Sequence, residues 1–246
     1  MSILKIIINI KYFLSRFFYT SKDKSRFIIK NNKIFKNSYY DKTSFKIKFS
    51  KVKKNDRDLI YKYLNLTNTS SGCNNFLNWG GGVGILDLLV QKKNIKIKTT
   101  IIEKKNLIQK IKLNSKLLNK YKNRNILFSE DQLLLKSDKF NMIIFFGSLC
   151  YLPEIYNFFK FSKAKFIAIS RLPMIINSNE DFIAHDNFGN HYEYFLSENK
   201  FKKFLLKDFK ILHYGEHWGG LKKNKKKIEQ FKIKSFDILL ERLNRI

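Results

Sequence analysis

The sequence is poor in cysteine, proline and glycine, and it contains no long apolar run. Only two of its 246 residues are cysteine, Cys73 and Cys150, so we exclude a disulfide scaffold and expect a reduced, cytoplasmic protein. The cysteines and the four histidines show no metal-ligand spacing, so we expect no metal site. No run approaches the roughly 20 apolar residues that a membrane span requires.

Acidic residues are scarce beside basic ones. Lysine and arginine number 49 against 20 aspartates and glutamates, a formal net charge of +29, which by itself would favour a nucleic-acid partner. However, only 7 of the 49 are arginine, the side chain that best recognises phosphates and base edges. Residues whose codons are rich in A and T are also abundant, which suggests that genome composition contributes to the positive charge. We therefore rank nucleic acid below other partners and interpret the basic run 222–227 as a solvated loop.

Four of the ten glycines stand within five consecutive positions, 80–84. Glycine lets the backbone turn sharply and approach a ligand without a Cβ in the way, and a following helix offers unpaired N–H groups. No Gly-Lys-Ser/Thr follows, which excludes a P-loop, and the dinucleotide pattern G-x-G-x-x-G fails at Ile85. A purely structural turn is the alternative to a cofactor loop. The pattern that fits is polar-x-G-x-G-x-G, which contains Asn78, Gly80, Gly81, Gly82 and Gly84.

A carboxylate follows the glycines at a spacing typical of nucleotide-binding folds. The segment 95–102 alternates apolar with polar or basic residues, which predicts a strand, and Glu103 comes directly after it. Glu103 lies 19 residues beyond Gly84 (103 − 84). Nucleotide-binding α/β folds place an acidic residue about 20 residues after the glycine loop, where it accepts hydrogen bonds from ribose hydroxyls. For Glu103 taken alone, a solvent-exposed strand end is the alternative.

Strand-like and helix-like segments alternate along the chain. Such an alternation predicts an α/β fold with a doubly wound parallel sheet. The run 140–146 is almost continuously apolar, as in a strand that is buried on both faces. We expect helices at 56–66 and 107–121 and further strands at 126–128, 140–146 and 164–169.

The glycine pattern resembles the first motif of class I S-adenosylmethionine-dependent methyltransferases, where the glycines admit the methionine moiety of the donor against the backbone. The resemblance implies a doubly wound Rossmann-like seven-stranded sheet and S-adenosyl-L-methionine as the cofactor. It also implies that two residues after strand 126–128 hold the adenine amine and that the turn after strand 140–146 lines the methyl-donor pocket. These residues are Glu130 and Asp131, and Gly147, Ser148 and Leu149.

Further motifs accompany the double-glycine motif between Phe76 and Trp218: Gly-Ser-Leu-x-Tyr-Leu-Pro at 147–153, Arg-x-Pro at 171–173 and Tyr-x-Tyr-Phe-Leu-Ser-Glu-x-x-Phe at 192–201. Together they resemble a methyltransferase family associated with bacterial lipopolysaccharide and O-antigen gene clusters. The resemblance implies methyl transfer to a sugar or polysaccharide precursor. An RNA methyltransferase and a non-catalytic protein that retains the fold are the alternatives.

The chain departs from that family at two positions, and each departure removes a carboxylate. The first motif of the family normally opens with Asp, where this chain has Asn78, and its Arg-x-Pro is often preceded by Asp, where this chain has Ser170. An amide oxygen still accepts a hydrogen bond but lacks charge assistance. We therefore expect Asn78→Asp to preserve or improve donor binding.

Transfer of a methyl group to a hydroxyl requires alignment of the reactants and removal of a proton. Beyond the strand predicted at 164–169, titratable groups are densest around His185 and His191. We predict these as candidate bases, with His185 preferred, and we include Arg171 of the Arg-x-Pro motif in the catalytic set. Each histidine taken alone is more often a surface or hydrogen-bonded residue than a base.

The N-terminal part, 1–54, is predicted to be a helical extension of a methyltransferase-like domain at 55–246. On a helix, Lys5, Lys11 and Arg16 share one side, and the isoleucines and phenylalanines of 3–17 share the other. Such a helix can lie in an anionic membrane surface, here the inner face of the membrane, where a lipid-linked precursor would be reached. Packing of its apolar face on the domain or on a second subunit is the alternative.

Overall fold

The computed structural model describes residues 54–68, 74–93, 96–114, 119, 121, 124–152, 154–185, 192–217 and 232–243, with the backbone alone for 182–185 and 192–193. The helix expected at 3–17, like His191, lies outside the described residues.

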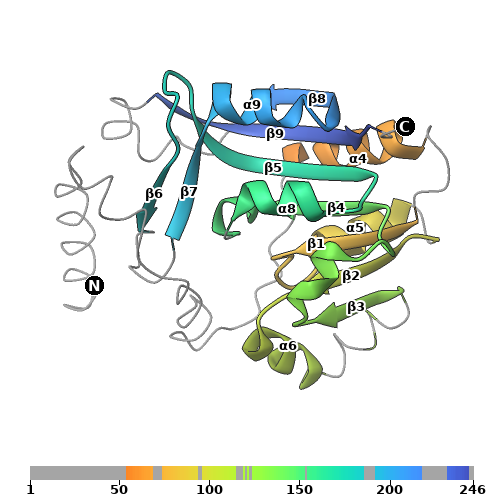
Figure 1. The fold of residues 1–246 in the computed structure, drawn as a ribbon. Coiled ribbons are helices and arrows are strands. Elements are labelled where there is room, and N and C mark those ends of the chain that lie inside the picture. Colours follow the sequence, from red (N-terminus) through yellow and green to blue (C-terminus); the bar gives the residue numbers. More distant parts are fainter. Residues whose placement is uncertain are drawn as a thin grey trace, which may run out of the picture.

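Seven strands form one mostly parallel sheet in the order β3-β2-β1-β4-β5-β9-β8 (Figure 1). The first five run parallel, and β9 lies antiparallel between β5 and β8. The predicted doubly wound, Rossmann-like sheet is thereby confirmed. The strands are β1 (Asn75–Trp79), β2 (Lys98–Ile102), β3 (Ile126–Ser129), β4 (Met142–Phe146), β5 (Phe166–Ile175), β8 (Phe209–Glu216) and β9 (Ile233–Arg242).

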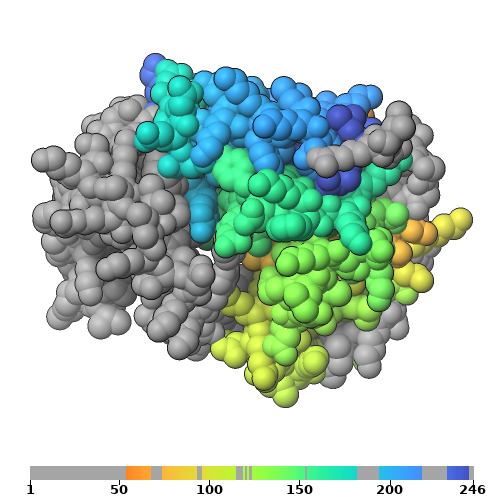
Figure 2. Space-filling model, viewed as in Figure 1, coloured from red at the N-terminus to blue at the C-terminus, as the bar shows by residue number. Residues whose placement is uncertain are grey.

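Helices cover both faces of this sheet. One face packs against α4 (Lys54–Asn68), α5 (Ile85–Lys93) and α6 (Lys105–Lys112), whose apolar sides are buried with those of the strands. The other face packs against α8 (Ile155–Phe161) and α9 (Glu198–Leu205), together with the short 3-10 helices η2 (Gln132–Lys136) and η3 (Leu149–Tyr151). The space-filling view shows the same side of the molecule, with residues of α8 and η2 at the surface (Figure 2).

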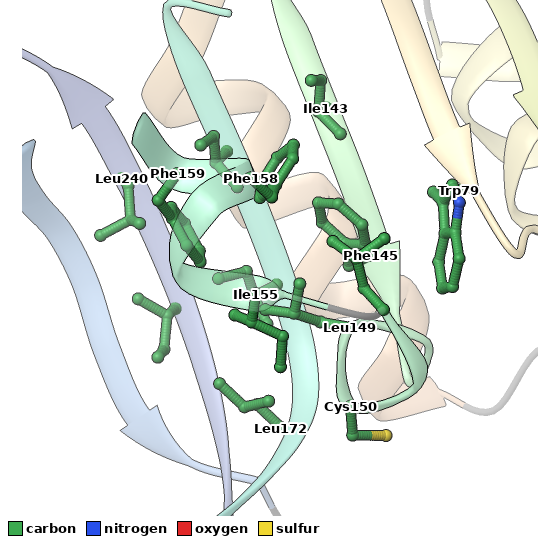
Figure 3. Close-up of a cluster of buried hydrophobic side chains, with 14 of the residues drawn as sticks. Trp79, Ile143, Phe145, Leu149, Cys150, Ile155, Phe158, Phe159, Leu172 and Leu240 are labelled. Carbon is green, nitrogen blue, oxygen red and sulfur yellow. The ribbon is translucent and has the colours of Figure 1, made fainter. Parts of the chain in front are cut away.

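Aromatic side chains contact one another within the core on the α8 face. Phe145 of β4 lies between Trp79, at the end of β1, and Phe158 of α8, with ring centroids 5.9 Å and 5.0 Å away (Figure 3). Leu149 points into the same cluster and is 1% exposed. Because aromatic pairs at such distances stabilise beyond their buried area, this cluster holds the ends of β1 and β4 in fixed positions.

Strand β5 is longer than the sequence predicts, and this difference shapes the site. We expected a strand at 164–169 with Arg171 and Pro173 beyond its end, but both residues lie inside β5, which continues to Ile175. A register shift against β9 occurs between Ile169 and Leu172, and Arg171 has a positive φ of 59°. The Arg-x-Pro motif therefore builds a β-bulge, a device that bends a strand and redirects side chains.

A hairpin of β6 (Phe182–His185) and β7 (Tyr192–Ser197) extends the sheet at its carboxyl edge. β4 pairs with β5 only as far as Ser170, and β7 takes the same side of β5 at Met174 and Ile175. Figure 1 shows the hairpin at the left end of β5. The hairpin thus stands beyond the end of β4, and β7 contacts η3.

Candidate cofactor and active site

The glycine loop joins β1 to α5 in a conformation that requires glycine. Gly80, Gly82 and Gly84 have φ values of +68°, +61° and +68°, where a residue with a Cβ is strained. A Cβ on Gly80 would lie 2.8 Å from Ser148 Cβ, and one on Gly84 would lie 2.7 Å from Ile101 Cδ1. These two glycines therefore pack against the ends of neighbouring strands.

Gly82 differs from its neighbours because its α-carbon faces open space. A Cβ built there would meet no atom of the described residues within 4 Å. Close packing against other described residues therefore does not explain the glycine at position 82. The glycine leaves room for a ligand to approach the backbone closely, as a cofactor loop does.

Glu103 lies beside this open position. The Gly82 N–H donates to Glu103 Oε1 at 2.8 Å, and the Lys104 N–H donates to Oε2 at 3.1 Å. Glu103 is only 8% exposed, which contradicts the alternative of a solvent-exposed strand end. Burial raises the pKa of Glu103, against the effect of these two N–H donors. The structure therefore places Glu103 next to the glycine loop, as the 19-residue spacing predicted.

Asn78 is paired with an aspartate that the sequence analysis missed. Asn78 Nδ2 donates to both carboxylate oxygens of Asp87, at 3.1 and 2.9 Å, and both residues are 1% exposed. Burial raises the pKa of Asp87 to about 7. Asn78 Oδ1 is buried and has no hydrogen-bond partner among the described residues. The only sequence signal for Asp87 was its place three residues after Gly84, in the first turn of α5.

The turn after β4 closes the other side of the loop. Ser148 Oγ donates to the Trp79 carbonyl at 2.6 Å, and the Gly147 N–H donates to the Ser170 carbonyl at 2.8 Å. Gly147 has a φ of +73°. Ser148 and Gly147 therefore connect the end of β1 to the bulge of β5, whereas the Leu149 side chain faces the core.

Glu130 and Asp131 follow β3, as predicted, and both are exposed. Asp131 Oδ1 accepts a hydrogen bond from the Leu133 N–H at 2.9 Å, which caps η2. The Asp131 carboxylate therefore has a structural role as the N-cap of η2.

A buried polar cluster that the sequence analysis did not anticipate surrounds Asp237 of β9. Its Oδ1 accepts hydrogen bonds from Ser170 Oγ at 2.8 Å and the Arg171 N–H at 3.1 Å, and His217 Nδ1 lies 2.9 Å from Oδ2. Burial alone would raise the pKa of Asp237, but these hydrogen bonds together bring it below its ordinary value. Asp237 thus supplies a carboxylate next to the position where Ser170 lacks one.

Arg171 and His217 face the carboxyl edge of the sheet from this cluster. The Arg171 guanidinium lies 5.6 Å from the Phe146 ring centroid, and its Nε has no hydrogen-bond partner among the described residues. A Cβ on Gly147 would lie 3.4 Å from that Nε. His217 directly follows β8, and its side chain is 9% exposed. Contacts therefore run from Gly80 through Ser148, Gly147 and the bulge to the His217–Asp237 pair.

Of the two predicted histidines, His185 is the last residue of β6 and pairs in register with Tyr192, so its backbone belongs to the hairpin beyond β4. Its side chain, like the whole of His191, lies outside the described part. Within that part, no group of three or more His, Cys, Asp or Glu could hold a metal ion. The helices that the structure describes include none of the length and apolar character needed to cross a membrane.

The fold is similar to that of several solved structures, two of which contain S-adenosylhomocysteine. The N-terminal domain of EvdMO1 with S-adenosylhomocysteine bound has a TM-score of 0.53 at 10% identity, covering 78% of this chain and 83% of that one. The O-methyltransferase of a trans-AT polyketide synthase multienzyme of Brevibacillus brevis, in complex with S-adenosylhomocysteine, has a TM-score of 0.54 at 12% identity, covering 76% and 73%. The [4+2]-cyclase SpnF has a TM-score of 0.53 at 13% identity, covering 75% and 80%.

These similarities establish the fold alone, since the identities are low and the fold also carries a cyclase. No protein-family model and no curated protein matches the sequence. The function must therefore be argued from the site itself.

Proposed function

We propose that this protein is an S-adenosyl-L-methionine-dependent methyltransferase that acts on a sugar or polysaccharide precursor in surface-polysaccharide biosynthesis. The observation that carries the proposal is the glycine loop, in which Gly82 has a positive φ, leaves space around its α-carbon among the described residues and donates its N–H to the buried Glu103. A loop that only turned the chain would not need an unfilled position beside a buried carboxylate.

The chain offers a group for each part of this donor. Glu103 accepts hydrogen bonds from the ribose hydroxyls, the glycine loop and Asn78 admit the methionine moiety, and Gly147 with Ser148 borders the pocket. Glu130 and Asp131 are the proposed partners of the adenine amine, although Asp131 also caps η2. When bound, the donor supplies an electrophilic methyl group on its sulfonium.

Proton removal from the acceptor is assigned to histidine. His217 is added to the predicted candidates His185 and His191, because Asp237 holds its Nδ1 and leaves Nε2 as the nitrogen for a substrate proton. Arg171 stays in the proposed catalytic set, since its guanidinium lies beside the end of β4. The two carboxyl groups near Asn78 and Ser170 argue against the non-catalytic alternative, because Asp87 and Asp237 lie where the sequence has replaced a carboxylate.

The sugar acceptor is supported by the sequence resemblance and by a neighbour. The EvdMO1 domain was also crystallised in the presence of S-adenosylhomocysteine and D-fucose, and that structure has a TM-score of 0.53 to this chain. A donor-dependent screen with nucleotide sugars and with RNA distinguishes the sugar acceptor from the RNA alternative. We also propose that the N-terminal helix expected at 3–17 contacts the inner face of the membrane. Vesicle sedimentation of the protein with and without this helix tests the proposal.

Calorimetry with S-adenosylhomocysteine tests the cofactor assignment. We expect the parent protein to bind it and Gly82→Val to abolish binding, because a branched side chain would fill the space that the donor needs and would strain a φ of +61°. A thermal melt of the variant separates loss of the site from loss of the fold. Equal affinity of the parent and the variant would remove the assignment.

A further inference from the structure

We infer that Asp87 is a donor-binding determinant, which provides through Asn78 the negative charge that recognises the α-ammonium group of the donor. The inference rests on the proposed function and adds a residue to it. The first motif that this chain resembles opens with a carboxylate at the position of Asn78, and here a carboxylate lies nine residues later, in the first turn of α5.

The Asn78 amide lies between the glycine loop and Asp87. A Cβ on Gly81 would lie 2.7 Å from Asn78 Nδ2, so the Asn78 side chain lies directly beneath the glycine loop. Its Nδ2 is held by both carboxylate oxygens of Asp87. This bond fixes the orientation of the amide, with the nitrogen toward Asp87.

The described residues leave two groups of this pair unsatisfied, the amide oxygen of Asn78 and the carboxylate of Asp87. Among the described residues, Asn78 Oδ1 is a buried acceptor without a donor. The Asp87 carboxylate is 1% exposed, and its described side-chain partner is the neutral amide of Asn78, not a cation. A buried acceptor without a partner and a buried charge without a counter-charge are each costly. Both costs are relieved by one ligand group that donates hydrogen bonds and carries positive charge.

The hydrogen bond couples the carboxylate of Asp87 to the amide of Asn78. A carboxylate that accepts from an amide N–H polarises that amide and strengthens its oxygen as an acceptor. An ammonium group at Asn78 Oδ1 would therefore sense the charge of Asp87 without touching it. The amino-acid end of the donor carries such a group, and Gly82 leaves the adjacent loop open for its approach.

The test compares two ligands that differ only at this end. S-adenosylhomocysteine carries the α-ammonium, and methylthioadenosine lacks the whole amino-acid end. We expect Asp87→Asn to weaken S-adenosylhomocysteine binding by about 10-fold or more, the range for hydrogen bonds to a charged group, and to leave methylthioadenosine binding within about 2-fold. The ratio of the two dissociation constants is read from each variant by itself, so a partly destabilised protein still gives an answer.

Two further variants complete the design. Asn78→Asp combined with Asp87→Asn returns one carboxylate and one amide to the pair, and we expect it to restore the ligand ratio of the parent. If Asp87→Asn alone fails to fold, this double variant decides. Asp56→Asn is the matched control, because Asp56 is also a buried acid in the first turn of a helix, α4, and it should change neither affinity.

The outcomes separate this inference from the function on which it rests. A parent protein that binds neither ligand contradicts the cofactor assignment. A parent that binds both, with an unchanged ligand ratio in Asp87→Asn or a ratio that the double variant does not restore, overturns the role of Asp87 and leaves the cofactor assignment in place.

Discussion

Replacement of Asn78 by aspartate, which restores the residue usual in the resembling family, should destabilise this protein. Asn78 Nδ2 lies 2.9 Å from Asp87 Oδ2 in a site where both residues are 1% exposed. The variant would place two carboxylates at this distance, and two buried like charges cannot both ionise. This prediction concerns the stability of the folded protein, whereas the expectation from the sequence, that Asn78→Asp preserves or improves donor binding, concerns the ligand.

The magnitude follows from the protonation that the variant needs. At pH 7, one extra carboxyl group must stay protonated in the folded state, although its ordinary pKa is about 3.9, so the cost approaches (7 − 3.9) × 1.36, or about 4 kcal/mol. At pH 5 the same expression gives about 1.5 kcal/mol. Since the folded-state pKa of this group is raised, its stability contribution is complete below the unfolded value and is lost as the pH rises. A proton shared between the two groups would reduce both figures.

Urea denaturation of the parent and Asn78→Asp at pH 5 and pH 7 measures this difference. Asn75→Asp is the matched control, because Asn75 begins the same strand and is more exposed than Asn78; it should cost little at either pH. A loss for Asn78→Asp that is absent at pH 7, or that is larger at pH 5 than at pH 7, would refute the reasoning.

Two substitutions test other parts of the site. Glu103→Ala should weaken S-adenosylhomocysteine binding by about 1.5–3 kcal/mol, the range for hydrogen bonds to a charged group, because it removes the acceptor that also fixes the Gly82 N–H; calorimetry measures it, and an unchanged affinity would exclude Glu103 as the ribose ligand. His217→Asn should reduce methyl transfer by about 10²-fold or more if His217 is the base, with unchanged donor affinity; full turnover in this variant would return the role to His185 or His191.

The parts of the fold that the sequence predicted are those set by local pattern. The apolar run 140–146 and the alternation before Glu103 mark β4 and β2 because period and burial are written into consecutive residues. The spacing between Gly84 and Glu103 predicted their neighbourhood because two parallel strands and a crossover helix leave little freedom in length. These are the features that one stretch of chain determines by itself.

The parts that the sequence did not predict depend on pairing between distant strands. Asp237 reaches Ser170 across 67 positions, and only the register of β9 against β5 brings them together. Pro173 suggested the end of a strand, because proline is rare inside sheets. It is tolerated here because it lies in the gap between Ser170, the last residue that pairs with β4, and Met174, the first that pairs with β7.

The carboxylates of Asp87 and Asp237 should affect stability with opposite dependence on pH. Burial raises the pKa of Asp87 to about 7, so its contribution is complete below its unfolded value near 3.9 and is lost as the pH rises toward 7. Hydrogen bonds lower the pKa of Asp237 in spite of burial, so its contribution is present above the unfolded value and is lost as the pH falls through the folded one. Relative to the parent, Asp87→Asn should therefore gain stability between pH 4 and pH 8, whereas Asp237→Asn should lose stability as the pH rises from 2 to 5. Because Glu103 titrates in the parent and in both variants, it cancels from these differences. Urea denaturation measures how the stability difference between each variant and the parent changes with pH. If this difference changed in the same direction for Asp87→Asn and Asp237→Asn, the reasoning would be contradicted, because it treats Asp87 as an unsatisfied carboxylate and Asp237 as one satisfied by hydrogen bonds.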